Sequence, residues 1–261
     1  MLVPNQFALV VTLAAATLAS SAQSLAPIHA RCVIGISDTV HEFTLHISDT
    51  DCPSDHHCGM NFSNESMSRF IGITLADLNN EGTHLAATLA AEAGTFTCDG
   101  TVHDRELSGD ALFTPDSAFV NRLGKLGFTG FDTQKLEAYA FVNVTSDYAR
   151  SLEEAHIQRI NIDNLIALRI FNVDPAYMQS LTAMGFEQPD ADKLIALKSQ
   201  GVNADEVKQI RALGYQPTLD ELIQIRIFQI TPDFVRRMQD RGFKNLTIAK
   251  LVQIRIFKLA E

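Results

Sequence analysis

The sequence predicts an α+β fold, in which a small antiparallel β domain is followed by an all-α array of helical hairpins. Segments such as VHEFTLHI (40–47) alternate apolar and polar residues with the period of two that is typical of strands. After residue 113 the apolar spacing changes to that of amphipathic helices. A leucine-centred motif then recurs every 28 or 29 residues, which is typical of stacked helical units.

The first residues, MLVPNQFALVVTLAAATLASSAQS, have the features of a secretory signal peptide. A short apolar run (7–19) is followed by the small residues 20–22, although no Lys or Arg precedes the run. We therefore predict a signal peptide over residues 1–22, a periplasmic or secreted protein, and no membrane span after cleavage. A buried or mobile apolar segment and an uncleaved signal anchor are the alternative interpretations.

The negative charge is concentrated in the first part of the chain. The net charge is -10, and residues 1–112 contain 3 Lys or Arg against 13 Asp or Glu, whereas the remainder contains 18 of each. All four cysteines and seven of the eight histidines also lie before residue 113. We therefore expect two domains, residues 31–113 and 114–261. Nucleic acid is not an expected partner, because phosphate binding requires a basic face.

In the first domain we predict an antiparallel sheet with one short helix. The helix is expected to begin at Thr74–Asp77 and to end near Gly82. The segment THLAATLAAEA (83–93) is ambiguous, because alanine favours a helix whereas the alternation of leucine and alanine allows a strand. The clearest strands are 40–47, 94–102 and 109–113, and Gly94, Gly100 and Gly109 are placed at turns or bulges.

The cysteines are expected to form disulfides, since their number is even and an exported chain meets an oxidising compartment. A loop-closing pair, Cys52–Cys58, would leave Cys32–Cys98 as the second pair. Free thiols or other pairings are a further interpretation. The alternative is a metal site, because thiolate and imidazole ligands suit zinc or copper. Its ligands would be Cys52, His56, His57 and Cys58.

The second domain is built from a repeat whose units begin near residues 128, 157, 186, 215 and 243. Such units bury their apolar faces against their neighbours, so we predict a solenoid-like array. The leucines that define the period are Leu136, Leu165, Leu194, Leu222 and Leu251.

Residue types that begin and end helices recur at fixed positions in the repeat. Asp, Asn or Thr stands four residues before each leucine and again nine residues after each of the first four, and these side chains cap helix N-termini. Thr218 and Glu221 form a capping box. Glycine ends each second helix, except for His156 in the first unit. The predicted capping residues are Asp116, Asp132, Thr145, Asn161, Asp174, Asp190, Asn203, Thr218, Thr231 and Thr247.

A cation follows four residues after most of these leucines. At 100° per residue, Arg226 lies about 40° from Leu222, inside the apolar arc of its helix. We favour a semi-buried cation that contacts helix-end carbonyls or an acid of the neighbouring unit. The alternative is a basic stripe that binds an anionic ligand or an acidic partner. The equivalent cations are Arg169, Lys198, Arg226 and Arg255, with Ala140 in the first unit.

AGTFTCDGTV (93–102), SGDALFTPDSAFVNRLGKLGF (108–128) and LIALRIFNVDPAYMQSLTAMGF (165–186) resemble segments of a largely uncharacterised family of bacterial exported proteins. The repeats also resemble the C-terminal tail of some membrane metallopeptidases of the beta-lactam-sensor type. The resemblance covers residue 94 to the end, and more loosely reaches back to Phe43. It implies a small β domain followed by a helical array outside the cytoplasm. The zinc motif of the peptidase is absent, so no catalytic residue carries over.

The function expected from these features is binding rather than catalysis. His41, Glu42 and His46 have the wrong spacing for a zinc-protease helix, and a G-x-S-x-G motif, a P-loop and a dinucleotide fingerprint are absent. We therefore predict a non-enzymatic interaction or scaffold protein without a cofactor, which binds an unidentified protein partner through its helical array. A metal-binding or metal-sensing protein that uses the 52–58 loop is the alternative, and a hydrolase is the weakest interpretation.

Overall fold

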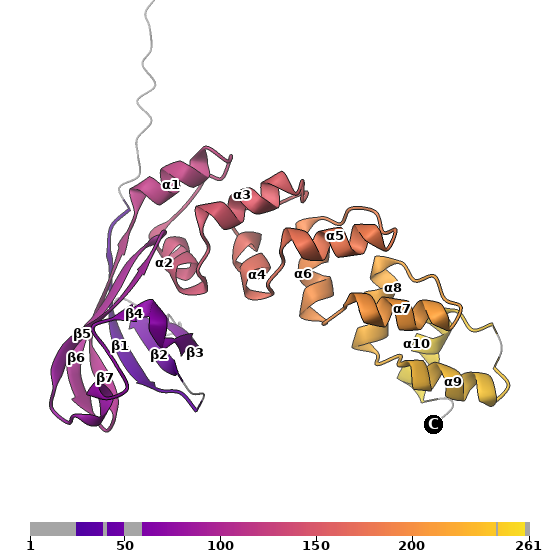
Figure 1. Cartoon of the computed structure of the whole chain (residues 1–261), viewed down its shortest axis with the longest axis horizontal. Helices are drawn as coiled ribbons and strands as arrows, with labels where there is room; N and C mark the ends of the chain where they lie inside the picture. The colour runs from indigo at the N-terminus through magenta and orange to yellow at the C-terminus, as the bar shows by residue number, and fades with distance from the viewer. Residues whose placement is uncertain (1–24, 39–40, 50–58, 244, 259–261) are drawn as a thin grey trace, which may run out of the picture.

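The computed structural model describes residues 25–38, 41–49, 59–243 and 245–258. In these residues a curled antiparallel sheet is followed by ten α-helices, so the predicted α+β class is confirmed (Figure 1). None of the helices described is long and apolar enough to cross a membrane. The predicted signal peptide and the Cys52–Cys58 loop, with His56 and His57, lie outside the described residues.

The sheet has the strand order β3-β2-β1-β7-β6-β5-β4, and every neighbouring pair is antiparallel. Along β6 and β7, buried and exposed residues alternate, so one face of the sheet carries the core and the other faces solvent. The strands are β1 (Ile28–Ile36), β2 (Glu42–Asp49), β3 (Gly59–Ser66), β4 (Phe70–Ile71), β5 (His84–Ala91), β6 (Gly94–His103) and β7 (Glu106–Pro115).

The ambiguous segment 83–93 contains strand β5. Residues His84 to Ala91 pair in register with β6, and Leu89 and Ala87 are fully buried on the core face. The pairing with β6 and β4 supplies backbone hydrogen bonds on both sides, and this tertiary context outweighs the helical propensity of alanine.

The sheet folds sharply at β7, where the disulfide Cys32–Cys98 joins strands β1 and β6. Both strands pair with β7, on opposite sides of it. Two strands separated by a third would be roughly 9.5 Å apart in a flat sheet. The Cα atoms of Cys32 and Cys98 are 5.9 Å apart, so the sheet curls at β7 and brings β1 and β6 closer together than in a flat sheet. The predicted Cys32–Cys98 pair is therefore present.

Gly100 and Gly109 lie where the sheet folds, and the prediction that they occupy turns or bulges is wrong. The two residues are directly paired in the middle of β6 and β7. A Cβ atom on Gly109 would lie 2.0 Å from the Asp99 carbonyl oxygen and 2.5 Å from the Gly100 Cα. The sequence shows only that glycine is needed; the reason is close backbone approach within the sheet rather than a turn. Gly94, in contrast, does follow the β5–β6 turn.

The predicted short helix is a single 3-10 turn, η2 (Asp77–Asn79), and a second turn, η1 (Met67–Arg69), precedes β4. Thr74 and Asp77 bond reciprocally. The backbone N and Oγ1 of Thr74 donate to Asp77 Oδ2 at 2.8 and 2.6 Å, and the Asp77 backbone N donates to Thr74 Oγ1 at 3.3 Å. The predicted pair of Thr74 and Asp77 is therefore formed, but it does not cap the turn, whose N-cap residue is Ala76 without a side-chain hydrogen bond.

The helices are short, with seven to ten residues each, as expected for the spacing of the caps. They are α1 (Ser117–Gly124), α2 (Thr133–Val142), α3 (Ser146–Glu154), α4 (Asn164–Ile170), α5 (Pro175–Ala183), α6 (Ala191–Ser199), α7 (Ala204–Ala212), α8 (Leu219–Ile227), α9 (Pro232–Asp240) and α10 (Ile248–Phe257).

The predicted N-caps are found at the helix starts. Nine of the ten side chains accept a hydrogen bond from a backbone N–H in the first turn of their helix, and Thr218 and Glu221 form the predicted capping box. The tenth, Asn161, accepts from the backbone N–H of Asp163 and Asn164 at 2.8 and 2.9 Å, although α4 begins at Asn164. Local side-chain chemistry therefore determines where each helix begins.

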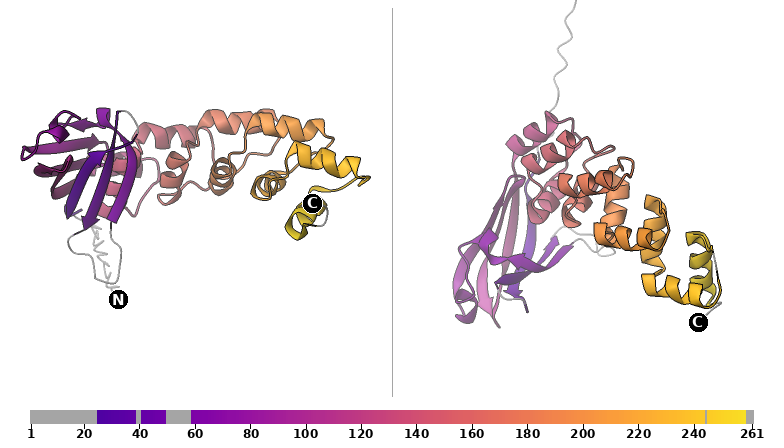
Figure 2. Two further views of the ribbon diagram at one scale, coloured as in Figure 1. Left: turned by 90° about the horizontal axis from the view of Figure 1, so that it is seen from below. Right: turned by 45° about the vertical axis from the view of Figure 1, so that its right-hand side comes forward.

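The helices extend away from the sheet in a row (Figures 1 and 2). Helix α2 contacts β5, β6 and β7, and the even-numbered helices then pack in succession, α2 on α4, α4 on α6, α6 on α8 and α8 on α10. Each residue predicted to end a second helix has positive φ, as do five residues that follow the even-numbered helices. The first group is His156, Gly185, Gly214 and Gly242, and the second is Asn143, Asn172, Gly201, Gln229 and Lys258.

The C-terminal end of α2 is fixed to the sheet by aromatic packing and by an arginine. The Phe141 ring lies 4.9 Å from that of Phe62 and 5.1 Å from that of Phe96, measured between ring centroids. Arg69 donates to the carbonyl oxygens of Ala140 and Phe141, both at 2.6 Å. Arginine is favourable there, because the last carbonyls of a helix carry partial negative charge.

Candidate functional site

Three of the four repeat cations lie over aromatic rings of the preceding helix. In each case the ring stands three residues after the N-cap of an odd-numbered helix. The electron-rich face of the ring attracts the positive charge. The three cations stay partly exposed to water. The pairs are Arg169 over Tyr148, Lys198 over Tyr177 and Arg255 over Phe234, at 5.2, 4.4 and 5.1 Å from the cationic group to the ring centroid.

The two tyrosines also join consecutive hairpins through their hydroxyl groups. Tyr148 Oη donates to the Val173 carbonyl at 2.8 Å, and Tyr177 Oη donates to the Val202 carbonyl at 3.0 Å. Burial raises the pKa of Tyr177 to about 12, so the hydroxyl stays protonated and able to donate at neutral pH. Each tyrosine therefore fills the space between a cation and a carbonyl of the next hairpin.

Arg226 differs, because its partner is the carboxylate of Glu206 rather than a ring. Glu206 stands three residues after the cap Asn203, which is the position of Tyr148 and Tyr177 in their helices. Arg226 Nη1 lies 3.6 Å from Glu206 Oε1, and Arg226 Nε donates to the Gln200 carbonyl at 2.7 Å. These are the two kinds of partner, a helix-end carbonyl and a neighbouring acid, that the sequence interpretation assigned to the cation.

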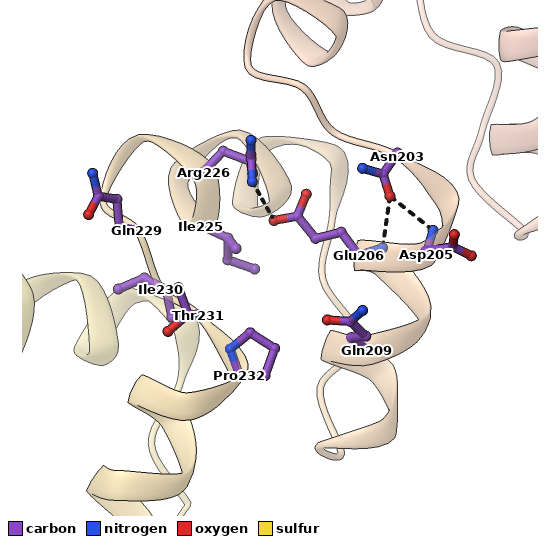
Figure 3. A pocket seen from close by; sticks show the side chains of 10 residues that line it. All are labelled: Asn203, Asp205, Glu206, Gln209, Ile225, Arg226, Gln229, Ile230, Thr231 and Pro232. Atoms are coloured by element: carbon purple, nitrogen blue, oxygen red, sulfur yellow. Dashed lines mark hydrogen bonds and ion pairs between the residues drawn. The ribbon is translucent and has the colours of Figure 1, made fainter.

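An open pocket of about 690 Å³ lies beside this pair, between α7 and the α8–α9 connection (Figure 3). Figure 3 shows Glu206 reaching from α7 toward Arg226 of α8, with Ile225, Ile230 and Pro232 on the same side of the pocket as Arg226. The wall is mixed, with apolar groups and hydrogen-bonding side chains, which suits binding of a ligand that has an apolar face and a polar edge. The lining residues are Asn203, Asp205, Glu206, Gln209, Ile225, Arg226, Gln229, Ile230, Thr231 and Pro232.

Asn203 fixes the start of the helix that carries Glu206, and the positive charge of Arg226 offsets only part of the effect of burial on the Glu206 carboxylate. Asn203 Oδ1 accepts from the backbone N–H of Asp205 and Glu206 at 3.1 and 3.0 Å, which fixes the start of α7. Burial raises the pKa of Glu206, and the nearby Arg226 opposes this effect without cancelling it. Within the described residues, the buried Glu206 Oε2 accepts no hydrogen bond.

The remaining predicted site residues are divided between the sheet and the part of the chain outside the structure's description. Cys32 and Cys98 form the disulfide inside the sheet. The alternative metal ligands, residues 52–58, are outside the described ranges. Among residues that the structure does describe, no group of three or more His, Cys, Asp or Glu side chains could hold a metal ion.

Sequence reasoning missed Glu206 and the pocket beside it, although the signal was available. The residues three positions after the caps of α3, α5, α7 and α9 are tyrosine, tyrosine, glutamate and phenylalanine. An alignment on the caps rather than on the leucines would have shown the single change from a ring to a carboxylate. Comparison with known proteins adds no assignment: no protein-family model, curated protein or solved structure matches the chain.

Proposed function

We propose that this chain is a non-enzymatic, extracytoplasmic interaction or scaffold protein, whose helices form a solenoid-like array that binds a protein partner. The observation that carries the proposal is an exposed apolar ridge at the C-terminal ends of α4, α8 and α10. A patch of large exposed apolar side chains on a folded chain is a mark of an interaction surface. The apolar ridge consists of Ile170, Phe171, Ile227, Ile256 and Phe257.

The ridge residues occupy equivalent positions, five or six residues after the repeat leucines. Ile170, Ile227 and Ile256 are 54, 52 and 50% exposed, which is high for isoleucine in a folded protein. Helices α4, α6, α8 and α10 pack in succession, so equivalent positions follow one another along the row. Helix α6 has Ser199 and Gln200 at these positions and separates the ridge into two apolar segments.

The first unit shows what covers this position when it is buried. Phe141, five residues after Leu136, is 1% exposed and packs on Phe62 and Phe96 of the sheet. The same end of the helix therefore docks on another part of the molecule in α2 and faces solvent in α4, α8 and α10. This contrast supports a partner that covers the ridge as the sheet covers Phe141.

Recurring contacts between units support the solenoid-like arrangement. In two cases the lysine before one repeat leucine forms an ion pair with the aspartate two residues before the next. The pairs are Lys135–Asp163 and Lys193–Asp220. Asn164 and Asp192 occupy the same positions and are 3.5 Å apart. Contacts that link each unit to the next are what a one-dimensional stack requires.

The disulfide Cys32–Cys98 supports a location outside the cytoplasm, because disulfides persist in oxidising compartments and are rare in the cytosol. The predicted signal peptide over residues 1–22 would deliver the chain there. Both features agree with a periplasmic or secreted protein, and fractionation of cells that express the tagged full chain tests this location.

Site-specific photo-cross-linking tests the binding surface. A photo-reactive residue replaces Ile170, Ile227 or Ile256 in turn, and cross-linking is carried out in cells or in an extracytoplasmic extract. Ile71 on strand β4 is the matched control, since it is an isoleucine that is 69% exposed but lies away from the ridge. We expect one protein to be captured from all three ridge positions and not from position 71.

Capture that does not differ between the ridge and position 71, or no capture at all, would contradict the proposal. Cross-linking to a second copy of this chain would identify the partner as itself, and sedimentation of the I227D and I256D double variant would then show dissociation. The variant also tests that capture depends on the apolar surface, because a charge at these exposed positions should leave the fold intact.

Metal binding through the 52–58 loop is the second candidate, favoured by the Cys–His–His–Cys set in the sequence. Metal analysis of protein purified without chelators is combined with the intact mass before and after reduction. Stoichiometric zinc or copper with one disulfide, Cys32–Cys98, would support a metal site. Two disulfides and no bound metal would exclude it.

A further inference from the structure

We infer that the pocket beside Glu206 binds a tyrosine side chain of the bound protein, which takes the place of the ring that this unit lacks. The inference rests on the proposed binding function and names the anchoring residue of the partner. It is carried by a comparison of the pocket with the equivalent space in the α5–α6 region, where the chain supplies the ring itself.

In the α5–α6 region, the ring of Tyr177 lies between a cation and a carbonyl group. Lys198 Nζ is 4.4 Å from the ring centroid, and the hydroxyl donates to the Val202 carbonyl at 3.0 Å. These two partners are four and eight residues after Leu194. Tyr148 makes the same pair of contacts, with Arg169 and the Val173 carbonyl. The geometry is therefore a repeated feature of the fold.

In the α7–α8 region, residues stand at both equivalent positions, but no ring of the described residues lies between them. Arg226 and Ile230 are four and eight residues after Leu222, and both line the pocket. Glu206 replaces the tyrosine, and its carboxylate lies beside Arg226 rather than under it. The pocket thus keeps the residues at the two positions that hold Tyr177 in the α5–α6 region, and it is open to solvent beside Glu206.

The chemistry of the pocket favours a phenol over other side chains. A ring can stack on the guanidinium group of Arg226, whose side chain is 44% exposed. The ring edge meets Ile225 and Ile230, and a hydroxyl can donate to the Ile230 carbonyl as Tyr177 does to Val202. An aliphatic side chain would gain only the apolar contact, and phenylalanine would lack the donor. Tyrosine is also common as an interface anchor, since one end is apolar and the other is polar.

The position of the pocket relates it to the apolar ridge. It lies beside α8, whose Ile227 belongs to the ridge, and it follows α6, where Ser199 and Gln200 interrupt the ridge. A partner that covers the ridge on both sides of α6 would pass this point. A tyrosine of the partner would there form a directional hydrogen bond where the apolar ridge is interrupted. Such a polar contact within an apolar interface determines the position of the partner along the ridge.

Nuclear magnetic resonance titration with single amino-acid amides tests the pocket directly. The probes are N-acetyl-tyrosinamide, N-acetyl-phenylalaninamide and N-acetyl-leucinamide, and the reporters are the side-chain amides of Gln209 and Gln229. We expect saturable shifts with the tyrosine probe and a dissociation constant on the order of 1 mM, as for a fragment. The phenylalanine probe should bind several-fold more weakly, and the leucine probe should cause no saturable shift.

The variant E206Y supplies a ring from the chain itself and should fill the pocket. We expect it to lose the shifts caused by the tyrosine probe while its thermal midpoint stays the same or rises. The matched control is E153Y, which makes the same substitution at an exposed position of α3 outside the pocket. E153Y should bind the probe as the unmodified protein does.

Unchanged probe binding in E206Y would overturn the inference, as would equal binding of the tyrosine and leucine probes or the absence of saturable shifts in the unmodified protein. The proposed function is judged separately by cross-linking at the ridge. Partner capture in a protein that does not bind the tyrosine probe would refute the pocket and leave the ridge standing. Binding of the tyrosine probe without any partner capture would refute the ridge as a binding surface and leave the pocket standing.

Discussion

The sheet and the helical row are stabilised in different ways. The sheet depends on contacts between residues far apart in the sequence, such as the disulfide between Cys32 and Cys98, which are 66 residues apart. The helical row depends on caps within each helix and on contacts between one hairpin and the next. A local change should therefore affect the two regions differently, cooperatively in the sheet and by a limited amount in the helices.

The junction between the regions combines the two modes. Glu92, in the β5–β6 turn, accepts from the Ser146 backbone N and Oγ at 3.1 and 2.6 Å and from Arg122 at 3.3 Å. Arg69 and the Phe62–Phe141–Phe96 rings hold the end of α2 against the sheet. The first hairpin is thus anchored by the sheet, whereas later hairpins are held by their neighbours. Variants that remove either the long-range contacts of the sheet or the contacts between hairpins test this comparison.

Removal of the disulfide should have the largest effect. We expect the double variant C32A and C98A to lose about 4 kcal/mol of unfolding free energy, because the closed loop restricts the unfolded chain. Urea unfolding monitored by circular dichroism at strand and helix wavelengths measures it. Loss of the strand signal before the helix signal would agree with two modes of stabilisation. Simultaneous loss of both signals would contradict it.

Gly109→Ala should destabilise the sheet by about 3 kcal/mol, since the new Cβ would overlap the Asp99 carbonyl oxygen and the backbone must shift. Gly124→Ala in α1 is the matched control, because no atom lies within 4 Å of the added Cβ. The control should change stability by less than about 1 kcal/mol and in the favourable direction. Thermal unfolding compares the two variants, and an equal loss in both would remove the role assigned to the close approach.

Arg226→Met should cost about 1.5 kcal/mol, because it removes a charged hydrogen bond to the Gln200 carbonyl and leaves the half-buried Glu206 without its cation. Lys198→Met is the comparison, and we expect a smaller loss there, since only stacking on Tyr177 disappears. Chemical unfolding of both variants measures the difference. Unchanged stability of Arg226→Met would sink the structural role of this cation.

Tyr177→Phe should cost about 1 kcal/mol, because the buried Val202 carbonyl loses its donor while the ring keeps its packing. Tyr215→Phe serves as the control, since the Tyr215 hydroxyl forms no hydrogen bond with the described residues, and it should change stability by less than about 0.5 kcal/mol. Both are measured by thermal unfolding. Equal effects would show that the hydroxyl of Tyr177 does not join the hairpins.

The smallest effect should be a pH dependence at the junction. Burial raises the pKa of Glu92, but the hydrogen bonds from Ser146 and the charge of Arg122 outweigh this effect and hold the pKa below its ordinary value. The folded pKa is therefore lower than the unfolded one, and stability that is present above pH 4.5 is lost as pH falls through the folded pKa. Unfolding at a series of pH values should show a flatter acid limb for Glu92→Gln, with a difference below about 1 kcal/mol.

The positions of the helices followed from the sequence, because caps act within one turn. Asp174, Asn203 and Thr231 were read as N-caps and accept backbone hydrogen bonds there. The alternation in β6 was read equally well. The domain limits stay predictions, as does the assignment of the helical region as a repeat-built binding surface.

The sheet order and the pocket were decided only by the tertiary structure. The sequence showed Gly109, but not that Gly100 lies opposite it, because register comes from pairing between distant strands. It showed Arg226, but whether a ring or a carboxylate meets the cation depends on which residue of the preceding helix lies beside it. Local chemistry thus fixed where the helices begin, and the packing of one hairpin on the next decided what their side chains contact.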